Sequence, residues 1–241
     1  MTGLMEKREL LQSGSTADVY RTDDPAVVLV SRKDTVEDRV SGRSEEIPGK
    51  GAVCSRMTNH LYRLLETKNV SGAFVEEVTD TDSLFRETKQ LPFDVIVRNY
   101  SAGKYPERTG IAEGTALAVP TVEFILKNQE LGDPMINGYD VLAMQLATEE
   151  EIETLVRTAF RVNEVLTPYF KSVNTDLIDM ELVFGRGKDG VVLTGELSPD
   201  TMRLWDSRTH EKLDKDRFRK GLGNVGDAYR EMFGRLNIGR V

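Results

Sequence analysis

The segment Gly190–Asp206 carries side chains that could bind an anion or move a proton. A short apolar run, Val191–Leu193, leads into a polar stretch that presents Glu196, Asp200 and Arg203. Loops held at the ends of strands are where proteins commonly place binding groups. Two carboxylates and a guanidinium in one such loop therefore predict a functional site, although loop capping also explains the two carboxylates.

Further charged residues suit the same chemistry. Arginine forks match the oxygens of phosphate and carboxylate groups, which makes Arg98, Arg203 and Arg219 candidates for anion binding. Lys50 stands between two glycines, and we expect a loop there that lets the backbone approach a ligand. Glu181 is a candidate general base. The alternatives are surface ion pairs for the arginines, a plain turn at Lys50 and an outward strand residue at Glu181.

Composition narrows the class of protein. Hydrophobic residues make up 39% of the 241 residues and charged residues 30%, which is typical of a globular chain. The 32 basic and 40 acidic residues give a net charge of −8, which argues against sequence-independent binding of nucleic acid. The apolar runs are too short to cross a bilayer, and no signal peptide is recognisable. A single cysteine, Cys54, excludes an internal disulfide, so we expect a cytoplasmic protein with no membrane or nucleic-acid partner.

Periodicity locates the elements that must position these residues. Helical spacing of apolar residues predicts helices over Ala52–Lys68 and Thr148–Ser172 and a helix or helix pair over Lys215–Leu236. The polar segment Lys33–Gly51 indicates a long functional loop. Strands are expected over the following ranges: Leu10–Tyr20, Ala26–Ser31, Ala73–Val78, Ser83–Glu87, Phe93–Tyr100, Thr121–Lys127, Leu177–Phe184 and Val191–Leu197. Strands and helices do not alternate regularly, so the sequence predicts an α+β fold.

Eight motifs occur in an order that resembles the SAICAR synthetase family, whose members join aspartate to a carboxylated aminoimidazole ribonucleotide with ATP. They are IPGKG at Ile47–Gly51, VIVRNYSAG at Val95–Gly103, RTGIAEG at Arg108–Gly114, EFILKN at Glu123–Asn128, DPMIN at Asp133–Asn137, LIDMELVFG at Leu177–Gly185, ELSPDTMRLWD at Glu196–Asp206 and LDKDRFR at Leu213–Arg219. The resemblance spans nearly the whole chain.

The resemblance implies a two-lobed fold with nucleotides bound in a cleft. A β-rich domain would cover residues 1–88, and a larger α+β domain would cover residues 89–241. The expected partner is a small-molecule phosphoribosyl imidazole, and a homodimer is expected by analogy. The residues that the resemblance assigns to substrate binding are Arg98, Ser101, Lys104, Asp200, Arg203, Lys215 and Arg219; Lys104 stands where the family has a serine.

The motifs depart from the family pattern on the ATP side. Gly14–Ala17 lacks both lysines of the family's GKAK turn, and Lys127–Gln129 replaces its KND. Glu181 takes the place of a lysine, and Val183 and Gly195 take the places of two carboxylates that the resemblance sets beside the metal. One charge facing a phosphate oxygen at about 5 Å is worth roughly 3 kcal/mol at an effective dielectric of about 20.

These departures lead to a main hypothesis and two alternatives. The main hypothesis is a divergent enzyme that binds a phosphoribosyl aminoimidazole and forms a bond or ring without ATP. It includes recruitment of a paralogue to a pathway for nucleoside antibiotics of the coformycin or pentostatin type. The alternatives are an authentic ATP-dependent C–N ligase and a non-catalytic ligand-binding protein. The catalytic candidates are Glu181, Glu196, Asp200 and Lys50. No metal ligand is expected except Glu196, and ATP and Mg²⁺ are expected only if the family reaction is retained.

Overall fold

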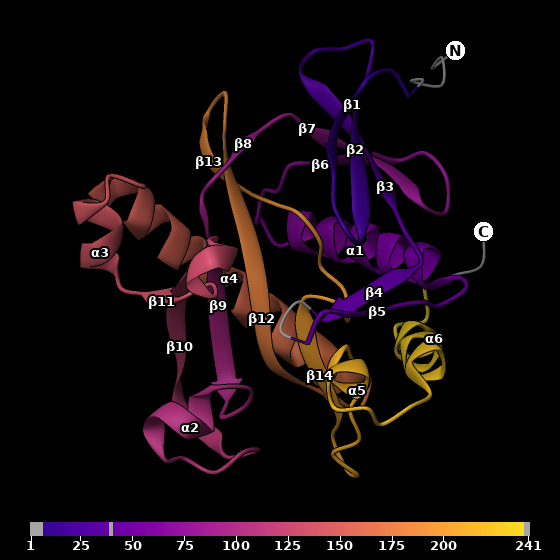
Figure 1. The fold of residues 1–241 in the computed structure, drawn as a ribbon, viewed down its shortest axis with the longest axis vertical. Helices are drawn as coiled ribbons and strands as arrows, with labels where there is room; N and C mark the ends of the chain where they lie inside the picture. The colour runs from indigo at the N-terminus through magenta and orange to yellow at the C-terminus, as the bar shows by residue number, and fades with distance from the viewer. Residues whose placement is uncertain (1–6, 39–40, 239–241) are drawn as a thin grey trace.

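Two antiparallel sheets form the framework of the chain (Figure 1). The computed structural model describes residues 7–38 and 41–238. The first sheet is N-terminal, and its strands run in the order β1-β2-β3-β7-β6. Their bounds are β1 Leu10–Ser13, β2 Ala17–Arg21, β3 Val27–Arg32, β6 Phe74–Glu77 and β7 Asp82–Arg86. Leu10–Tyr20 is therefore not one strand, because the turn around Gly14 splits it into the β1–β2 hairpin, in which the Gly14 N–H donates to the carbonyl of Ala17.

The larger sheet has the order β11-β10-β9-β12-β13, and β8 and β14 also pair with β12. Its bounds are β8 Lys89–Gln90, β9 Phe93–Tyr100, β10 Ala116–Leu126, β11 Met135–Ile136, β12 Thr175–Gly187, β13 Gly190–Thr194 and β14 Met202–Asp206. The long strand β12 is paired along most of its length, so it is the structural centre of this half of the molecule. Antiparallel pairing throughout both sheets confirms the α+β prediction.

Helix α4 (Glu149–Ser172) covers one face of the larger sheet (Figure 1). The Thr148 side chain and Glu151 form a capping box at its start, and three glutamates in the first turn favour the positive end of the helix dipole. Leu155 and Leu166 of its apolar stripe are fully buried in the core beneath the sheet. The helix predicted over Thr148–Ser172 is confirmed.

Helix α1 (Lys50–Thr67) packs against the N-terminal sheet. Its buried side chains, such as Leu61, belong to the same hydrophobic cluster as Phe85 of β7 and Leu182 of β12. One core therefore extends from the first sheet to the second. The domain boundary between residues 88 and 89 falls in the link from β7 to β8 and stays a prediction.

The segment Lys33–Gly51 is not the long loop that the sequence predicts. It contains a two-stranded hairpin, β4 (Thr35–Asp38) and β5 (Arg43–Glu46), followed by the start of α1. Val36 is the residue that anchors it, because this single apolar side chain is completely buried among residues of α1, α5 and α6. One apolar residue among so many charges left too weak a pattern to predict a strand.

The remaining elements are short or C-terminal. They are α2 (Tyr105–Thr109), the 3₁₀ turn η1 (Gln129–Leu131), α3 (Gly138–Ala143), α5 (Asp216–Arg219) and α6 (Val225–Arg235). The last two confirm a helix pair over Lys215–Leu236. No helix in the described part of the chain is long and apolar enough to cross a membrane.

Candidate functional site

One face of the larger sheet is apolar and the other is charged, because the two residue types alternate along its central strands. The apolar residues face α4 and are buried: Val95, Val97, Met180 and Leu182. The residues between them, together with neighbours on β10 and β14, form the opposite face, here called the charged face: Asp94, Arg98, Glu123, Asp179, Glu181 and Arg203. The pairing register sets Asp179 between Arg98 and Arg203.

Three arginines on and beside this face share three carboxylates, and we call these six residues the arginine cluster. Arg98 donates to Asp179 and lies 3.2 Å from Glu123. Arg203 Nη1 lies 2.8 Å from Asp179 Oδ2, and its Nε lies 2.8 Å from Asp216 Oδ2. Arg219 Nη1 donates to the other oxygen of Asp216 at 2.8 Å. The arginines thus converge as predicted, and in this structure they are held by carboxylates.

Electrostatics keep Arg203 and Asp216 of the arginine cluster ionised. Burial opposes the charge of Arg203, but Asp179 and Asp216 raise the pKa of its guanidinium. Burial likewise opposes the charge of Asp216, yet Arg203 and Arg219 lower the pKa of its carboxyl to about 2. Asp214 differs, because burial and the neighbouring Asp216 charge raise its pKa to about 7.

The loop after β9 rests on these arginines. The Ala102 carbonyl accepts a hydrogen bond from Arg98 Nη1 at 3.0 Å. Gly103 has φ 60°, and a Cβ there would lie 2.9 Å from Arg203 Nη2, so glycine is required by both conformation and space. Lys104 follows at the start of α2, exposed and without an ion pair among the described residues. The hydroxyl of Ser101 is buried and donates to the Ile111 carbonyl, which supports the loop rather than a ligand.

Lys215 lies between the arginine cluster and a second group of charges. Burial lowers the pKa of its ammonium, while Asp200 acts in the opposite direction. The side chain makes no ion pair or hydrogen bond with the described part of the chain. It is therefore a cation available to an anionic ligand.

The second group, here called the buried cluster, consists of Arg32, Lys50, Glu196 and Asp200. Lys50 Nζ lies 2.5 Å from Asp200 Oδ2, and Arg32 Nη1 lies 2.6 Å from Glu196 Oε2. The four side chains are between 1% and 8% exposed, so both ion pairs are almost dry. The remaining oxygens are also used, since Tyr229 donates to Asp200 Oδ1 at 2.6 Å and Ser198 donates to Glu196 Oε1.

The position of Lys50 corrects the sequence prediction. It is not in an open loop but is the first residue of α1, where Gly49 caps the helix with φ 84°. Its ammonium is enclosed with the Asp200 carboxylate. Burial alone would raise the pKa of that carboxyl, but the charges of Lys50 and Lys215 lower it below its ordinary value. The pocket beside this pair has a volume of only about 110 Å³.

Glu181 is the acidic residue of the charged face with open oxygens. Solvent reaches its side chain, and no hydrogen bond or ion pair is formed with the described residues. Protein atoms nevertheless surround it closely enough that desolvation, aided by the Asp94 charge, raises the pKa of its carboxyl. A carboxyl with a raised pKa and open oxygens is suited to accept a proton.

The carboxylates of the buried cluster do not fit Mg²⁺ in this arrangement. Cys54, Glu196 and Asp200 bring ligand atoms within 4.8 Å of one another. Arg32 and Lys50 already neutralise the two carboxylates, and burial raises the pKa of the Cys54 thiol well above its usual value. Mg²⁺ requires open oxygen ligands, so it would first have to displace these partners.

The two positions where the resemblance implies metal carboxylates are in contact here. A Cβ on Gly195 would lie 2.9 Å from the Cβ of Val183, and Gly195 has φ 82°. Val183 therefore fills the space that a side chain at position 195 would need. This pair contributes packing and no oxygen ligand.

Comparison with known proteins settles the family. The model of the SAICAR synthetase family matches residues 10–236, and the chain therefore belongs to this family. Among similar proteins are the phosphoribosylaminoimidazole-succinocarboxamide synthases of Lachnoclostridium phytofermentans and Coprothermobacter proteolyticus, each 45% identical; the alignments cover 97% and 96% of this chain and 100% and 99% of theirs.

Solved structures agree with this assignment. The phosphoribosylaminoimidazole-succinocarboxamide synthase of Ehrlichia chaffeensis superposes with a TM-score of 0.93 at 32% identity, covering 97% of this chain and 100% of that one. A SAICAR synthetase in complex with ADP gives a TM-score of 0.92 at 32% identity, covering 97% and 99%. The predicted SAICAR synthetase fold is confirmed.

The comparisons do not support the finer expectations. Relatives at 45% identity over nearly their full length carry the synthase name, which gives no support to a divergent member of an antibiotic pathway. The same relatives, and the ADP complex, favour the ATP-dependent ligase over the ATP-independent reading.

Sequence reasoning missed four residues that organise the site: Arg32, Asp179, Asp216 and Tyr229. Asp179 had a signal, because it lies two residues before Glu181 in a strand and must share its face. Asp216 lies within the LDKDRFR motif, three residues before Arg219. No sequence signal marks Arg32 or Tyr229, because their partners are distant in the sequence.

Proposed function

We propose that this chain is an ATP-dependent ligase that joins the amino group of aspartate to the carboxylate of a phosphoribosyl aminoimidazole. The family and its named relatives support the reaction type. The observation that carries the substrate class is the arginine cluster with Lys104 and Lys215 at its margins, both without ion pairs among the described residues.

The arginine cluster would bind the phosphate of the substrate. Arg203 and Arg219 already present guanidinium forks to Asp216, so a phosphate would take over part of this coordination. The carboxylates of the arginine cluster cancel the positive charge of its three arginines. Lys104 and Lys215 would supply the positive charge that attracts the phosphate. The Ala102–Gly103 backbone, held against Arg98 and Arg203, would close this end of the site.

Glu181 would act on the aspartate amine. An ammonium group must lose a proton before it attacks a carbonyl carbon, and a carboxylate with a raised pKa and open oxygens can accept that proton. The carboxylate of the imidazole would be activated by phosphoryl transfer from ATP, because an unmodified carboxylate oxygen is a poor leaving group. The buried cluster would keep Lys215 and the loop around Asp200 in place rather than touch the reacting atoms.

A second candidate is supported by the ion pair between Arg32 and Glu196 and by the contact of Val183 with Gly195. Both remove oxygen ligands that a Mg²⁺–triphosphate requires. On this alternative, the same phosphoribosyl aminoimidazole is bound and converted without ATP.

A thermal-shift titration separates the two candidates. The ligands are ATP with Mg²⁺ and, separately, aminoimidazole carboxamide ribotide. A ligand present at about 100 times its dissociation constant stabilises the fold by about 2.7 kcal/mol. A shift with both ligands, and product from the carboxylated ribotide, aspartate and ATP, supports the ligase. A ribotide shift without an ATP–Mg²⁺ shift contradicts it and favours the second candidate. A ribotide shift without any product would indicate a binding protein.

A further inference from the structure

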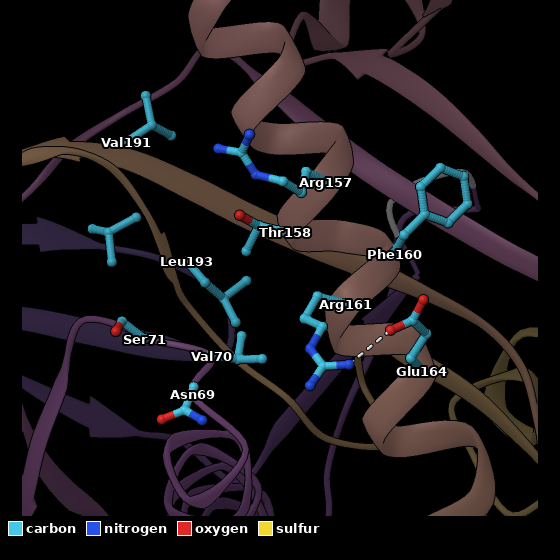
Figure 2. A pocket seen from close by; sticks show the side chains of 11 residues that line it. Asn69, Val70, Ser71, Arg157, Thr158, Phe160, Arg161, Glu164, Val191 and Leu193 are labelled. Carbon is cyan, nitrogen blue, oxygen red and sulfur yellow. Dashed lines mark hydrogen bonds and ion pairs between the residues drawn. The ribbon is translucent and has the colours of Figure 1, made fainter.

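A second pocket lies away from both charged clusters. It has a volume of about 570 Å³, within the range of small-molecule sites. The turn after α1, the middle of α4 and strand β13 line it (Figure 2). None of the residues assigned above to the proposed reaction takes part in it.

Cations stand at one side of this pocket and apolar groups at the other. Figure 2 shows Arg157 and Thr158 pointing from α4 toward β13, while Arg161 extends on the side of Asn69 and Val70. Positions 157 and 161 are one helical turn apart, so their guanidinium groups can reach one anion. The half-buried Val191 forms an apolar wall, backed by the buried side chains of Val70 and Leu193.

The two arginines are free to bind a ligand. Arg157 donates only to Thr154 at 3.3 Å and has no carboxylate partner among the described residues. Arg161 pairs with Glu164 in its own helix at 2.9 Å, but the two side chains are 53% and 64% exposed. An ion pair this exposed contributes little and can be exchanged for another anion.

Strand β13 adds backbone hydrogen-bonding groups. Its β12 side is paired, and the Leu193 carbonyl on the other side accepts from the Ala73 N–H. Val191 lies two residues earlier and points its N–H and carbonyl the same way as Leu193. No backbone partner is found for them among the described residues, so a donor and an acceptor lie at the open edge of the strand beside the apolar wall.

We propose that this pocket binds a nucleoside monophosphate. The phosphate meets Arg157 and Arg161, and the flat base lies on Val191, which Val70 and Leu193 back from below. The edge of the base hydrogen-bonds to the backbone of Val191. Thr158 and Ser71 lie between the two ends, where the ribose hydroxyls fall.

The test uses the full chain with ¹³C-labelled valine and leucine methyl groups, titrated with AMP in NMR spectra. The expected result is that AMP shifts the methyl signals of Val70, Val191 and Leu193. Adenosine, which lacks the phosphate, should bind these residues at least about tenfold more weakly, as expected for the loss of hydrogen bonds to a charged group. Binding at the charged face is recognised separately through the Val183 methyls.

The double variant R157Q/R161Q should lower the AMP affinity at these methyls at least about tenfold. Both residues are exposed, so folding should be retained, and an unchanged melting temperature checks this. R208Q is the matched control, because it removes the same charge from an exposed turn after β14 and should leave AMP binding unchanged. The proposal is overturned if millimolar AMP leaves the three residues unshifted, if adenosine binds as well as AMP, or if R157Q/R161Q binds like the wild type.

Discussion

The arginine cluster and the buried cluster both join cations to carboxylates, yet they are built for different tasks. In the arginine cluster, Arg203 is 20% exposed and Arg219 is 36% exposed, and unpaired lysines stand beside them. In the buried cluster no side chain exceeds 8% exposure, and every carboxylate oxygen has a partner. On our proposal the first cluster exchanges its partners for a ligand, whereas the second holds the surrounding backbone in place.

Breaking the buried cluster should have the largest effect. Lys50→Met leaves the Asp200 charge enclosed without its cation, and such a loss typically costs about 3–5 kcal/mol of unfolding free energy. In Lys50→Met/Asp200→Asn no charge is left unpaired at this position, and Tyr229 keeps an acceptor, so most of the loss should be recovered. Urea unfolding measures both. If the losses of unfolding free energy in Lys50→Met and in Asp200→Asn simply added up in the double variant, the two residues would not form an energetic pair.

Changing Glu181 should affect turnover and leave the fold intact. Glu181→Gln removes the proposed proton acceptor, and we expect kcat to fall about a hundredfold, the lower end for a positioned base, because water also reaches the site. The acidic limb of the pH–kcat profile should disappear, since the raised pKa of this carboxyl would set it. Glu130→Gln on η1 is the control. An unchanged pH–kcat profile would show that Glu181 is an outward-facing strand residue with no role in proton transfer.

Removing an arginine should weaken the ligand more than the protein. Arg203→Ala should lower the affinity for aminoimidazole carboxamide ribotide about 10- to 100-fold, the loss expected for charged hydrogen bonds. The fold should survive, because Asp179 keeps Arg98 and Asp216 keeps Arg219. Calorimetric titration measures the affinity, with Arg208→Ala as the control. If Arg203→Lys restored full affinity, the fork geometry would be unimportant.

The last prediction concerns the dependence of stability on pH. Asp214 has a pKa of about 7 in the fold against 3.8 ordinarily, so the folded state holds an extra proton between these values. Its stabilising contribution is complete below about pH 4 and is lost as the pH rises through about 7, with a slope of about 1 kcal/mol per pH unit. Asp214→Asn should remove this slope between pH 5 and 7 in unfolding titrations. An equal slope in both proteins would refute the assignment.

Much of the fold follows from local patterns. The period of apolar residues and the Thr148 cap define α4, and alternation along β9 and β12 predicts which residues face away from the core. The motif resemblance correctly brought Arg98, Arg203 and Arg219 together, because it carries information on distant pairing that periodicity lacks.

What could not be predicted depends on long-range contacts. The β4–β5 hairpin is held by the burial of Val36 against α5 and α6, which are distant in the sequence. The glycines on either side of Lys50 predict a loop, yet Lys50 is the first residue of a helix and its side chain is enclosed with Asp200. The closed state of Glu196 depends on Arg32, whose position in the sequence offers no hint of it.

The ion pair between Arg32 and Glu196 also sets an order for events during synthesis. Its two residues are 164 positions apart, which at roughly 5–20 residues per second separates their emergence by about ten to thirty seconds. While the chain is being synthesised, the Arg32 side chain therefore stays in water until the segment that carries Glu196 has left the ribosome. The closing of this pair on the ribosome would mark the moment at which the two sheets become one molecule.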